Sequence, residues 1–224
     1  MKLDAVGVFG GTFDPVHIGH LHVAQGVRRV FGLPRVLLVP CAIPSHKSPG
    51  AIHSADHRIA MLRLALAGQA GLEISTLEVE RGGTSFTIDT MLALGGGGRS
   101  APVFILGLDA LADLPTWREH RRLVEEFDLV AVDRPGGSLP AAVRCLGRTI
   151  GRRIVSIPDQ NALVGLPPPG KGGRIFHLAL PPIPVSSREV RALSAAGAPL
   201  TSLVPPAVAR YIREQVLYRE EGSR

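Results

Sequence analysis

Cysteine and aromatic residues are scarce in this sequence of 224 residues, which contains two Cys, seven Phe, two Tyr and one Trp. Cys41 and Cys145 lie far apart, and neither belongs to a Cys-x-x-Cys pair. The composition therefore indicates neither a disulfide framework nor a cysteine-rich zinc site. Two isolated cysteines are typical of a protein from a reducing compartment, and we expect this protein to be cytoplasmic.

Long apolar runs are also missing, since none reaches the roughly 18 residues that a membrane-spanning helix requires. The sequence passes from Met1-Lys2 directly into an apolar segment, without the charged and apolar regions of a signal peptide. We therefore expect no membrane span.

Acidic residues are outnumbered, with 19 Asp and Glu against 25 Lys and Arg, so the net charge is +6 and the pI about 10.1. Charge of this kind steers nucleotides and nucleic acids alike toward a protein. The basic residues are scattered, aromatic residues are few, and neither an RNA-binding signature nor a continuous basic helix is present. The sequence therefore predicts an anionic partner, and nucleic-acid binding is not expected.

A hydrophobic content of 45% over 224 residues is enough for one sizeable core. Segments typical of buried strands alternate with segments of helical periodicity. We expect strands over residues 5–9, 35–40, 72–79, 103–106, 129–132 and 174–180. This alternation predicts an α/β fold with an open, mostly parallel, doubly wound (Rossmann-like) sheet, flanked by helices on both faces.

We expect a single domain over residues 1–224, whose C-terminal portion, about 186–218, is helical. Ser186 and Glu189 form a capping box at the start of a helix there. Residues 136–173 carry the weakest pattern. Within them, residues 165–172 nearly match a phosphate-binding P-loop, but Gly172 replaces the Ser or Thr and three prolines remove N–H donors, so we expect a surface loop.

The stretch Gly10 to His22, GGTFDPVHIGHLH, follows a strand-like segment and precedes a helical one, so it is a strand-to-helix turn. Gly10 and Gly11 let the backbone turn tightly and approach a ligand closely. In an open parallel sheet such a turn lies at the ligand crevice, into which the following helix directs N–H groups and its positive dipole end. The stretch therefore predicts a phosphate-binding site.

His17 and His20 are three residues apart, and a helix that begins near His17 places both imidazoles on one face. Imidazoles beside a helix N-terminus can donate hydrogen bonds to a phosphate and stabilise charge that develops during group transfer. Gly19 between them leaves room for a flat group against the backbone. The same pair could be half of a zinc site, but such a site needs further ligands that the cysteines do not supply.

Two later segments also combine turn residues with polar or aromatic side chains. In the glycine-rich turn Arg81 to Thr87, we expect Thr84 or Ser85 to cap the helix that follows. Trp117, the only tryptophan, follows a helix-breaking proline and precedes a strongly polar segment. A core residue rarely has such neighbours, although a lone tryptophan is more often core than ligand contact.

The segment GGTFDPVHIGH resembles the nucleotide-binding signature of the nucleotidylyltransferase superfamily, whose core is the His-x-Gly-His element. The longer form, with GGTFDPVH in front, is similar to that of the bacterial nicotinate-nucleotide adenylyltransferases. The resemblance covers about residues 8–117 and 185–218. Four further segments resemble elements of this family in order: Pro44 to Lys47, Ser85 to Thr90 with Phe86 for the usual Tyr, Gly107 to Trp117, and Val185 to Arg191.

The resemblance implies transfer of AMP from ATP to nicotinate mononucleotide, which gives nicotinate adenine dinucleotide and pyrophosphate in NAD biosynthesis. It implies Mg²⁺ that arrives with ATP, since the sequence shows no dedicated carboxylate cage for a metal. Two alternatives stay open: an adenylyltransferase for nicotinamide mononucleotide or phosphopantetheine, and a nucleotide-binding sensor without catalysis. The sequence does not indicate an oligomeric state.

The implied roles fall on particular residues, and none is assigned to a metal. The catalytic residues are His17, His20, Lys47 and Arg191. The ATP site comprises Gly10, Gly11, Thr12, Phe13, His17, Gly19, His20, Ser186, Ser187 and Arg191. The nicotinate-nucleotide site comprises Thr12, Lys47, Ser85, Thr87, Asp109 and Trp117, with Trp117 stacked on the pyridine ring. His46 and Arg188 lie within the matching segments without an assigned role.

Overall fold

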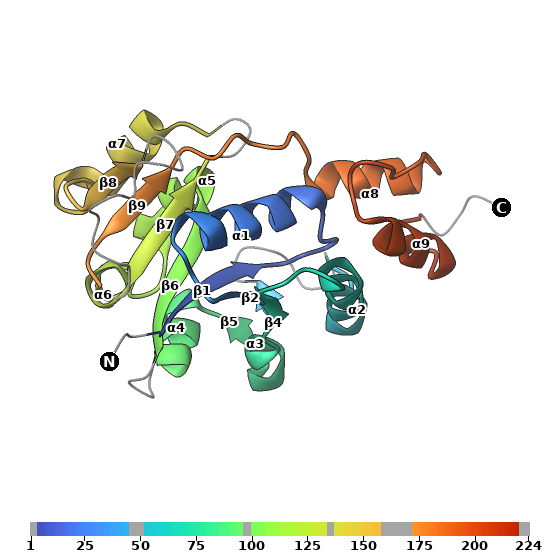
Figure 1. Cartoon of the computed structure of the whole chain (residues 1–224), viewed down its shortest axis with the longest axis horizontal. Coiled ribbons are helices and arrows are strands. Elements are labelled where there is room, and N and C mark those ends of the chain that lie inside the picture. Colours follow the sequence, from blue (N-terminus) through green and yellow to red (C-terminus); the bar gives the residue numbers. More distant parts are fainter. Residues whose placement is uncertain (1–3, 45–51, 96–99, 134–136, 158–171, 220–224) are drawn as a thin grey trace.

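The computed structural model describes residues 4–44, 52–95, 100–133, 137–157 and 172–219 (Figure 1). Lys47, His46 and all but the last residue of the near P-loop lie outside these ranges. The strands are β1 (Asp4–Gly11), β2 (Arg35–Pro40), β3 (Ile43–Pro44), β4 (Leu72–Ile74), β5 (Thr84–Ser85), β6 (Ser100–Gly107), β7 (Asp128–Val132), β8 (Ile154–Ile157) and β9 (Ile175–Leu178). The helices are α1 (Ile18–Val30), α2 (Ala55–Leu66), α3 (Leu77–Arg81), α4 (Thr87–Gly95), α5 (Leu108–Asp113), the 3-10 turn η1 (Leu114–Thr116), α6 (His120–Glu126), α7 (Leu139–Gly151), α8 (Ser187–Ala195) and α9 (Pro206–Glu214).

Seven strands form one sheet in the order β4-β2-β1-β6-β7-β9-β8, and every described pair in it is parallel. β3 and β5 form a separate parallel pair. The Rossmann-like α/β architecture that the sequence predicts is therefore confirmed.

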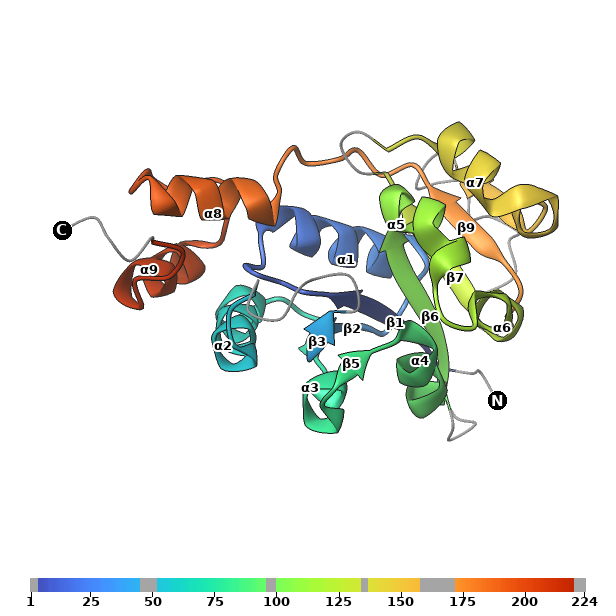
Figure 2. The ribbon, with the colours of Figure 1, turned by 180° about the vertical axis from the view of Figure 1, so that it is seen from behind.

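Helices cover both faces of the sheet, so alternate side chains of each strand enter two different cores. In β6, Val103 and Ile105 pack in a core with α1, α2, α8 and α9, whereas Phe104 and Leu106 pack in a core with α4 to α7. Figure 1 shows α1 across one face, and Figure 2 shows α5 and α6 on the other. Burial on both faces explains why the central strands are continuously apolar in sequence.

The order of the strands reverses between β1 and β6. From β1 the chain first adds β2 on one side and later returns to pair β6 on the other side. Such a switch point leaves a crevice beyond the carboxyl ends of the two strands, because the following segments diverge to opposite faces. β1 ends at Gly11 and β6 at Gly107, so these glycines border the crevice.

The strand predicted over residues 72–79 is wrong in its second half, because β4 ends at Ile74 and α3 follows. The alternating pattern is misleading there because the polar residue Glu78 points inward. Its buried carboxylate accepts a hydrogen bond of 2.6 Å from Oγ1 of Thr90. Gly82 then ends α3 with φ of 69°, a left-handed conformation that favours glycine.

The weakly patterned region 136–173 contains α7 and β8, which the sequence did not predict. The helical periodicity of α7 is interrupted at Gly147, whose φ of 70° is not helical. β8 has only four residues, of which one is exposed and one is fully buried. β8 is therefore too short to show a clear period, whereas α7 does carry helical spacing, since its buried residues Ala142, Leu146 and Ile150 lie four positions apart.

Candidate active site

Two cavities lie beyond the carboxyl ends of β1 and β6, at the switch point of the sheet. The larger cavity has a volume of about 500 Å³ and the smaller cavity about 40 Å³. Phe9 and Gly107 line both, so the two cavities are neighbours on either side of these strand ends. Together they form one candidate site with two compartments.

The larger cavity brings together several segments that are distant in the sequence. They include the end of β1 with the turn after it, the turn between β5 and α4, the end of β6, and residues 116–118 at the end of η1. The residues predicted for the ATP and pyridine sites that line this cavity are Gly10, Gly11, Thr12, Ser85, Thr87 and Trp117. The fold thus assembles at one place the residues that the sequence motifs marked separately.

The turn before α4 is built differently from the sequence prediction. Thr84 and Ser85 do not cap α4, because they form β5 and pair with β3. Oγ of Ser85 accepts a hydrogen bond of 3.0 Å from the backbone N–H of Ala42, which ties this turn to the end of β2. α4 begins at Thr87, so its N-terminus borders the larger cavity.

Trp117 is half-buried and combines the two roles that the sequence left open. One edge of its indole packs against Phe104, with ring centroids 5.9 Å apart and planes at 78°. The side chain also lines the larger cavity. Next to it, the guanidinium of Arg118 lies 4.8 Å from the centroid of the Phe86 ring, so a cation borders the same cavity.

The smaller cavity is lined by His17, Gly19 and His20. His17 is the N-cap residue of α1, so both histidines project from the first turn of the helix, as predicted. Their rings stack with centroids 3.7 Å apart and planes at 29°. Nδ1 of His20 accepts a hydrogen bond of 3.2 Å from the backbone N–H of His17. The proton of a neutral His20 therefore lies on Nε2, which is the donor that this ring offers to a ligand.

Gly19 lines the smaller cavity and also has a packing role. A Cβ at this position would lie 3.0 Å from Nδ1 of His17 and 3.0 Å from Cγ1 of Val185. The His17 imidazole therefore lies close against the Gly19 backbone. Glycine allows this ring to pack close to the first turn of α1.

Phe13 and Asp109 do not line either cavity. Phe13 is 2% exposed and packs edge-on against His20, with centroids 5.0 Å apart, so it supports the histidine from behind. Asp109 is exposed in the first turn of α5, between Gly107 and Ala110, which both line the larger cavity.

The residues predicted at the start of α8, Ser186, Ser187 and Arg191, line neither cavity, and two of them bind the loop between β1 and α1. Oγ of Ser186 caps α8 by accepting from the Glu189 N–H at 3.1 Å, as the capping box predicts. Ser187 donates to the Pro15 carbonyl at 2.9 Å, and Arg191 donates to the Asp14 carbonyl at 2.6 Å. Arg188 is exposed.

Sequence reasoning missed a buried polar network beneath this loop. Asp14 is 2% exposed and accepts hydrogen bonds from the Tyr218 hydroxyl at 2.7 Å and from the His53 N–H at 3.2 Å. Arg58, 1% exposed, donates to the carbonyls of Thr12, Ala42 and His53. These partners are up to 204 positions apart in the sequence, so no local pattern could have revealed them.

Among the described residues, no group of three or more His, Cys, Asp or Glu side chains could hold a metal ion. Within the same parts of the chain, no helix is long and apolar enough to cross a membrane.

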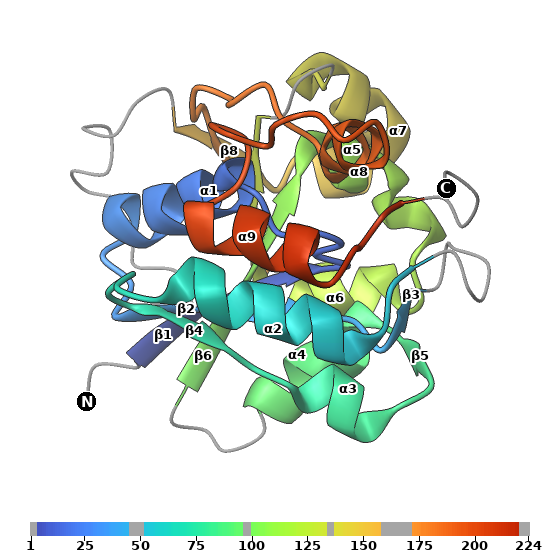
Figure 3. The ribbon, with the colours of Figure 1, turned by 90° about the vertical axis from the view of Figure 1, so that its right-hand side faces the viewer.

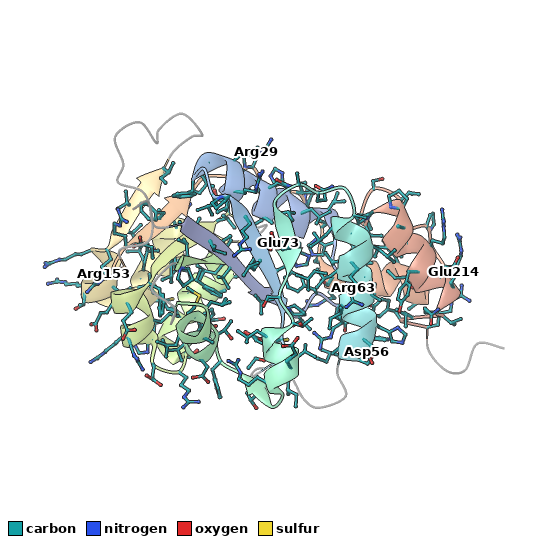
Figure 4. The ribbon with its side chains drawn as sticks, turned by 60° about the horizontal axis from the view of Figure 1, so that its bottom comes forward. Arg29, Asp56, Arg63, Glu73, Arg153 and Glu214 are labelled. Atoms are coloured by element: carbon teal, nitrogen blue, oxygen red, sulfur yellow. The ribbon has the colours of Figure 1, made fainter. Side chains whose placement is uncertain are left out.

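Figure 4 labels charged side chains around the outside of the molecule, on several different elements: Arg29, Asp56, Arg63, Glu73, Arg153 and Glu214.

Sequence comparison relates the chain to one family over most of its length. A model of the cytidylyltransferase-like family matches residues 8–193. A protein of Symbiobacterium thermophilum named "probable nicotinate-nucleotide adenylyltransferase" is 43% identical over 214 residues, which are 95% of this chain and 94% of that protein. A protein of the same name from Cellvibrio japonicus is 38% identical over 217 residues, covering 96% of this chain and 98% of that protein.

Structural comparison relates the fold to a solved enzyme. The structure of Plasmodium falciparum nicotinic acid mononucleotide adenylyltransferase complexed with NaAD superimposes with a TM-score of 0.70 at 19% identity. The match covers 96% of this chain and 97% of that one. The two chains therefore share their fold along almost their whole length.

Proposed function

The chain belongs to the cytidylyltransferase-like family and, within it, to the nicotinate-nucleotide adenylyltransferases, and from this premise we propose that it transfers AMP from ATP to nicotinate mononucleotide. The products are nicotinate adenine dinucleotide and pyrophosphate, as in the biosynthesis of NAD. The observation that carries the proposal is the two-compartment site at the switch point, with the stacked His17 and His20 in one compartment and Trp117 in the other.

A volume of about 40 Å³ holds only part of a nucleotide, so we assign the reacting phosphates of ATP to the smaller cavity and to the loop between the two cavities. His20 offers Nε2–H, and the first turn of α1 adds the positive end of its dipole, so negative charge is stabilised there. Arg191 is anchored to the Asp14 carbonyl and leaves further guanidinium donors for a phosphate. We also assign Lys47 to the triphosphate; this residue lies outside the described residues.

We assign the pyridine nucleotide to the larger cavity, where Trp117 provides a flat aromatic surface. The acceptor phosphate can then attack the α-phosphorus of ATP in line, because the two cavities meet at Phe9 and Gly107. The protein contributes positioning of both substrates and stabilisation of the charge that develops on the phosphate.

Magnesium enters the proposal as part of the ATP substrate. The described residues offer no cluster of carboxylates, and the carboxylate of Asp14 next to the site is already bound by Tyr218 and His53. Mg²⁺ would arrive bound to phosphate oxygens of ATP and would neutralise part of the charge of the triphosphate.

The function is tested by following pyrophosphate release from ATP and Mg²⁺ with a panel of phosphorylated acceptors. Nicotinate mononucleotide is expected to be the preferred acceptor. Preference for nicotinamide mononucleotide or phosphopantetheine would replace the proposed acceptor, and ATP binding without turnover of any acceptor would indicate a sensor.

Removal of the indole tests the assignment of the larger cavity. Trp117→Ala is expected to weaken binding of nicotinate mononucleotide by about 1 to 3 kcal/mol, the scale of base–aromatic stacking. Binding of ATP should change little, because Trp117 does not line the smaller cavity. Calorimetric titration with each nucleotide measures both effects, and Trp117→Phe, which retains a ring, should restore part of the loss. A variant that unfolds would show that Trp117 serves the core alone.

The ring substituent provides a second test, and we expect the acid nucleotide to be preferred over the amide. The larger cavity is bordered by the N-terminus of α4 at Thr87 and by the guanidinium of Arg118, which both favour an anion, while the Glu78 carboxylate that also lines it accepts a hydrogen bond from Thr90. An amide N–H₂ that faces these donors would be buried without a partner, at a cost of about 1 to 3 kcal/mol, or roughly ten- to a hundredfold. Comparison of kcat/KM for the two nucleotides at one Mg–ATP concentration decides the point. Equal use of both would contradict the preference and leave adenylyl transfer intact.

A further inference from the structure

The two tyrosines of the chain both belong to its C-terminal segment, and each contacts a histidine in or before α2. Tyr211 lies in α9, which packs beside α2 (Figure 3), and its hydroxyl is 2.9 Å from Nδ1 of His57. Tyr218 lies beyond α9, and its ring meets that of His53 edge-on, with centroids 4.3 Å apart. Of these two hydroxyls, the one of Tyr218 reaches the loop between β1 and α1.

That hydroxyl donates a hydrogen bond of 2.7 Å to Oδ1 of Asp14. Asp14 lies between Thr12, which lines the larger cavity, and His17, which lines the smaller one. The other carboxylate oxygen of Asp14 accepts from the His53 N–H at 3.2 Å, and the His53 ring lies 3.4 Å from Oδ1. The carboxylate thus fixes the middle of the loop to the start of α2 and to the C-terminal segment.

The same residue is held from its other side through the main chain. The Asp14 carbonyl accepts a hydrogen bond of 2.6 Å from Arg191, and the Pro15 carbonyl accepts one of 2.9 Å from Ser187. The position of Asp14 therefore sets where the Arg191 guanidinium lies relative to the histidines. A shift of the loop would move His17 and Arg191 together.

The Tyr218 hydroxyl is suited to this contact over the whole working range of pH. Burial, reinforced by the negative charge of Asp14, raises the pKa of Tyr218 well above its ordinary value. The hydroxyl therefore remains a donor to the carboxylate. A carboxylate that is 2% exposed requires such donors, because burial of a charge without partners is costly.

We propose that Tyr218 is a positioning residue for adenylyl transfer, which through Asp14 holds the loop from Thr12 to His17 and the Arg191 guanidinium in the geometry that binds ATP. This inference rests on the proposed function, which assigns ATP to this loop. The C-terminal segment then helps to position the site, although Tyr218 lines neither cavity.

The test compares Tyr218→Phe with Tyr211→Phe, because each variant removes one hydroxyl from the same segment. Tyr218→Phe is expected to lower kcat/KM for ATP about tenfold, since a small misplacement of reacting groups costs this much or more. The KM for nicotinate mononucleotide should stay within about twofold of the unmodified protein, because Tyr218 does not touch the larger cavity. Tyr211→Phe should leave both constants within about twofold. The melting temperatures of both variants are measured first, and the kinetics are run at a temperature where both variants are folded. The tenfold loss of kcat/KM for ATP in Tyr218→Phe is expected under these conditions.

Two outcomes would overturn the inference. The first is unchanged kcat/KM for ATP in Tyr218→Phe, and the second is an equal loss in both variants, which would indicate general packing of α9. Calorimetric titration with Mg–ATP separates this inference from the function, because it needs no acceptor. An unmodified protein that binds ATP but does not use nicotinate mononucleotide would contradict the function, while weaker ATP binding in Tyr218→Phe alone would still support the role of Tyr218.

Discussion

Replacement of His20 with alanine is expected to lower kcat by about 10² to 10³, the loss that follows removal of one preorganised hydrogen-bond donor from a developing negative charge. The physical reason is the fixed orientation of the ring. Its Nδ1 is bound to the His17 N–H, and its faces are held by the stacked His17 ring and the edge of Phe13. The Nε2–H donor therefore needs no reorganisation when the α-phosphate becomes more negative.

Steady-state kinetics with saturating ATP and nicotinate mononucleotide measures this loss. His57→Ala is a suitable control, because His57 lies in α2, contacts Tyr211 and lines neither cavity. His17→Ala should also lose activity, but His17 is 3% exposed, so the free energy of unfolding must be measured alongside kcat. Near-normal turnover in His20→Ala, with the fold intact, would remove this histidine from the mechanism.

Much of the site could be predicted from the sequence because its parts are local motifs. Each of the turns after β1, before α4 and after η1 carries its own pattern of glycine, proline or hydroxyl residues. A parallel sheet brings the carboxyl ends of its strands to one edge, so Gly11 at the end of β1 and Gly107 at the end of β6 meet at one cavity, although 96 positions separate them. Ser85 and Trp117 line the same cavity, but Ser85 lies in the separate β3–β5 pair and Trp117 follows η1, so their motifs marked them without showing where they would meet.

The supporting residues could not be predicted, because their environment is created only by folding. Glu78 alternates with apolar neighbours like an exposed strand residue, yet α3 turns it inward to Thr90. Asp14 is typical of a turn residue before proline, which gives no sign that it is buried beneath Tyr218. Gly19 lines the smaller cavity, but nothing in the local sequence showed that it also accommodates the neighbouring His17 ring.

Arg58 should have the largest effect on stability among these supporting residues. Its guanidinium is 1% exposed and joins three segments of the site: the turn after β1, the end of β2 and the residues before α2. Nη1 donates to the Thr12 carbonyl at 3.0 Å, Nε to the His53 carbonyl at 3.0 Å, and Nη2 to the Ala42 carbonyl at 3.3 Å.

Arg58→Met retains much of the side-chain volume but leaves the carbonyls of Thr12, Ala42 and His53 without their donor. Each hydrogen bond from a charged donor contributes about 1.5 to 3 kcal/mol, and a buried carbonyl left without a donor costs about 1 to 3 kcal/mol. These contributions overlap, so we expect the free energy of unfolding to fall by about 3 to 5 kcal/mol in total. For a chain of this length, the melting temperature should fall by roughly 10 °C.

Urea denaturation of Arg58→Met and of Arg63→Met measures this loss against a matched control. Arg63 lies one turn further along α2, is exposed and is replaced by the same residue, so its variant should stay within about 0.5 kcal/mol of the unmodified protein. Saturating Mg–ATP should restore part of the stability of Arg58→Met, because a ligand that binds only the folded state shifts the equilibrium toward it. Equal stability of the two variants would show that the three carbonyls find water or other donors when Arg58 is absent, and that the loop after β1 is held by Asp14 and α8 alone.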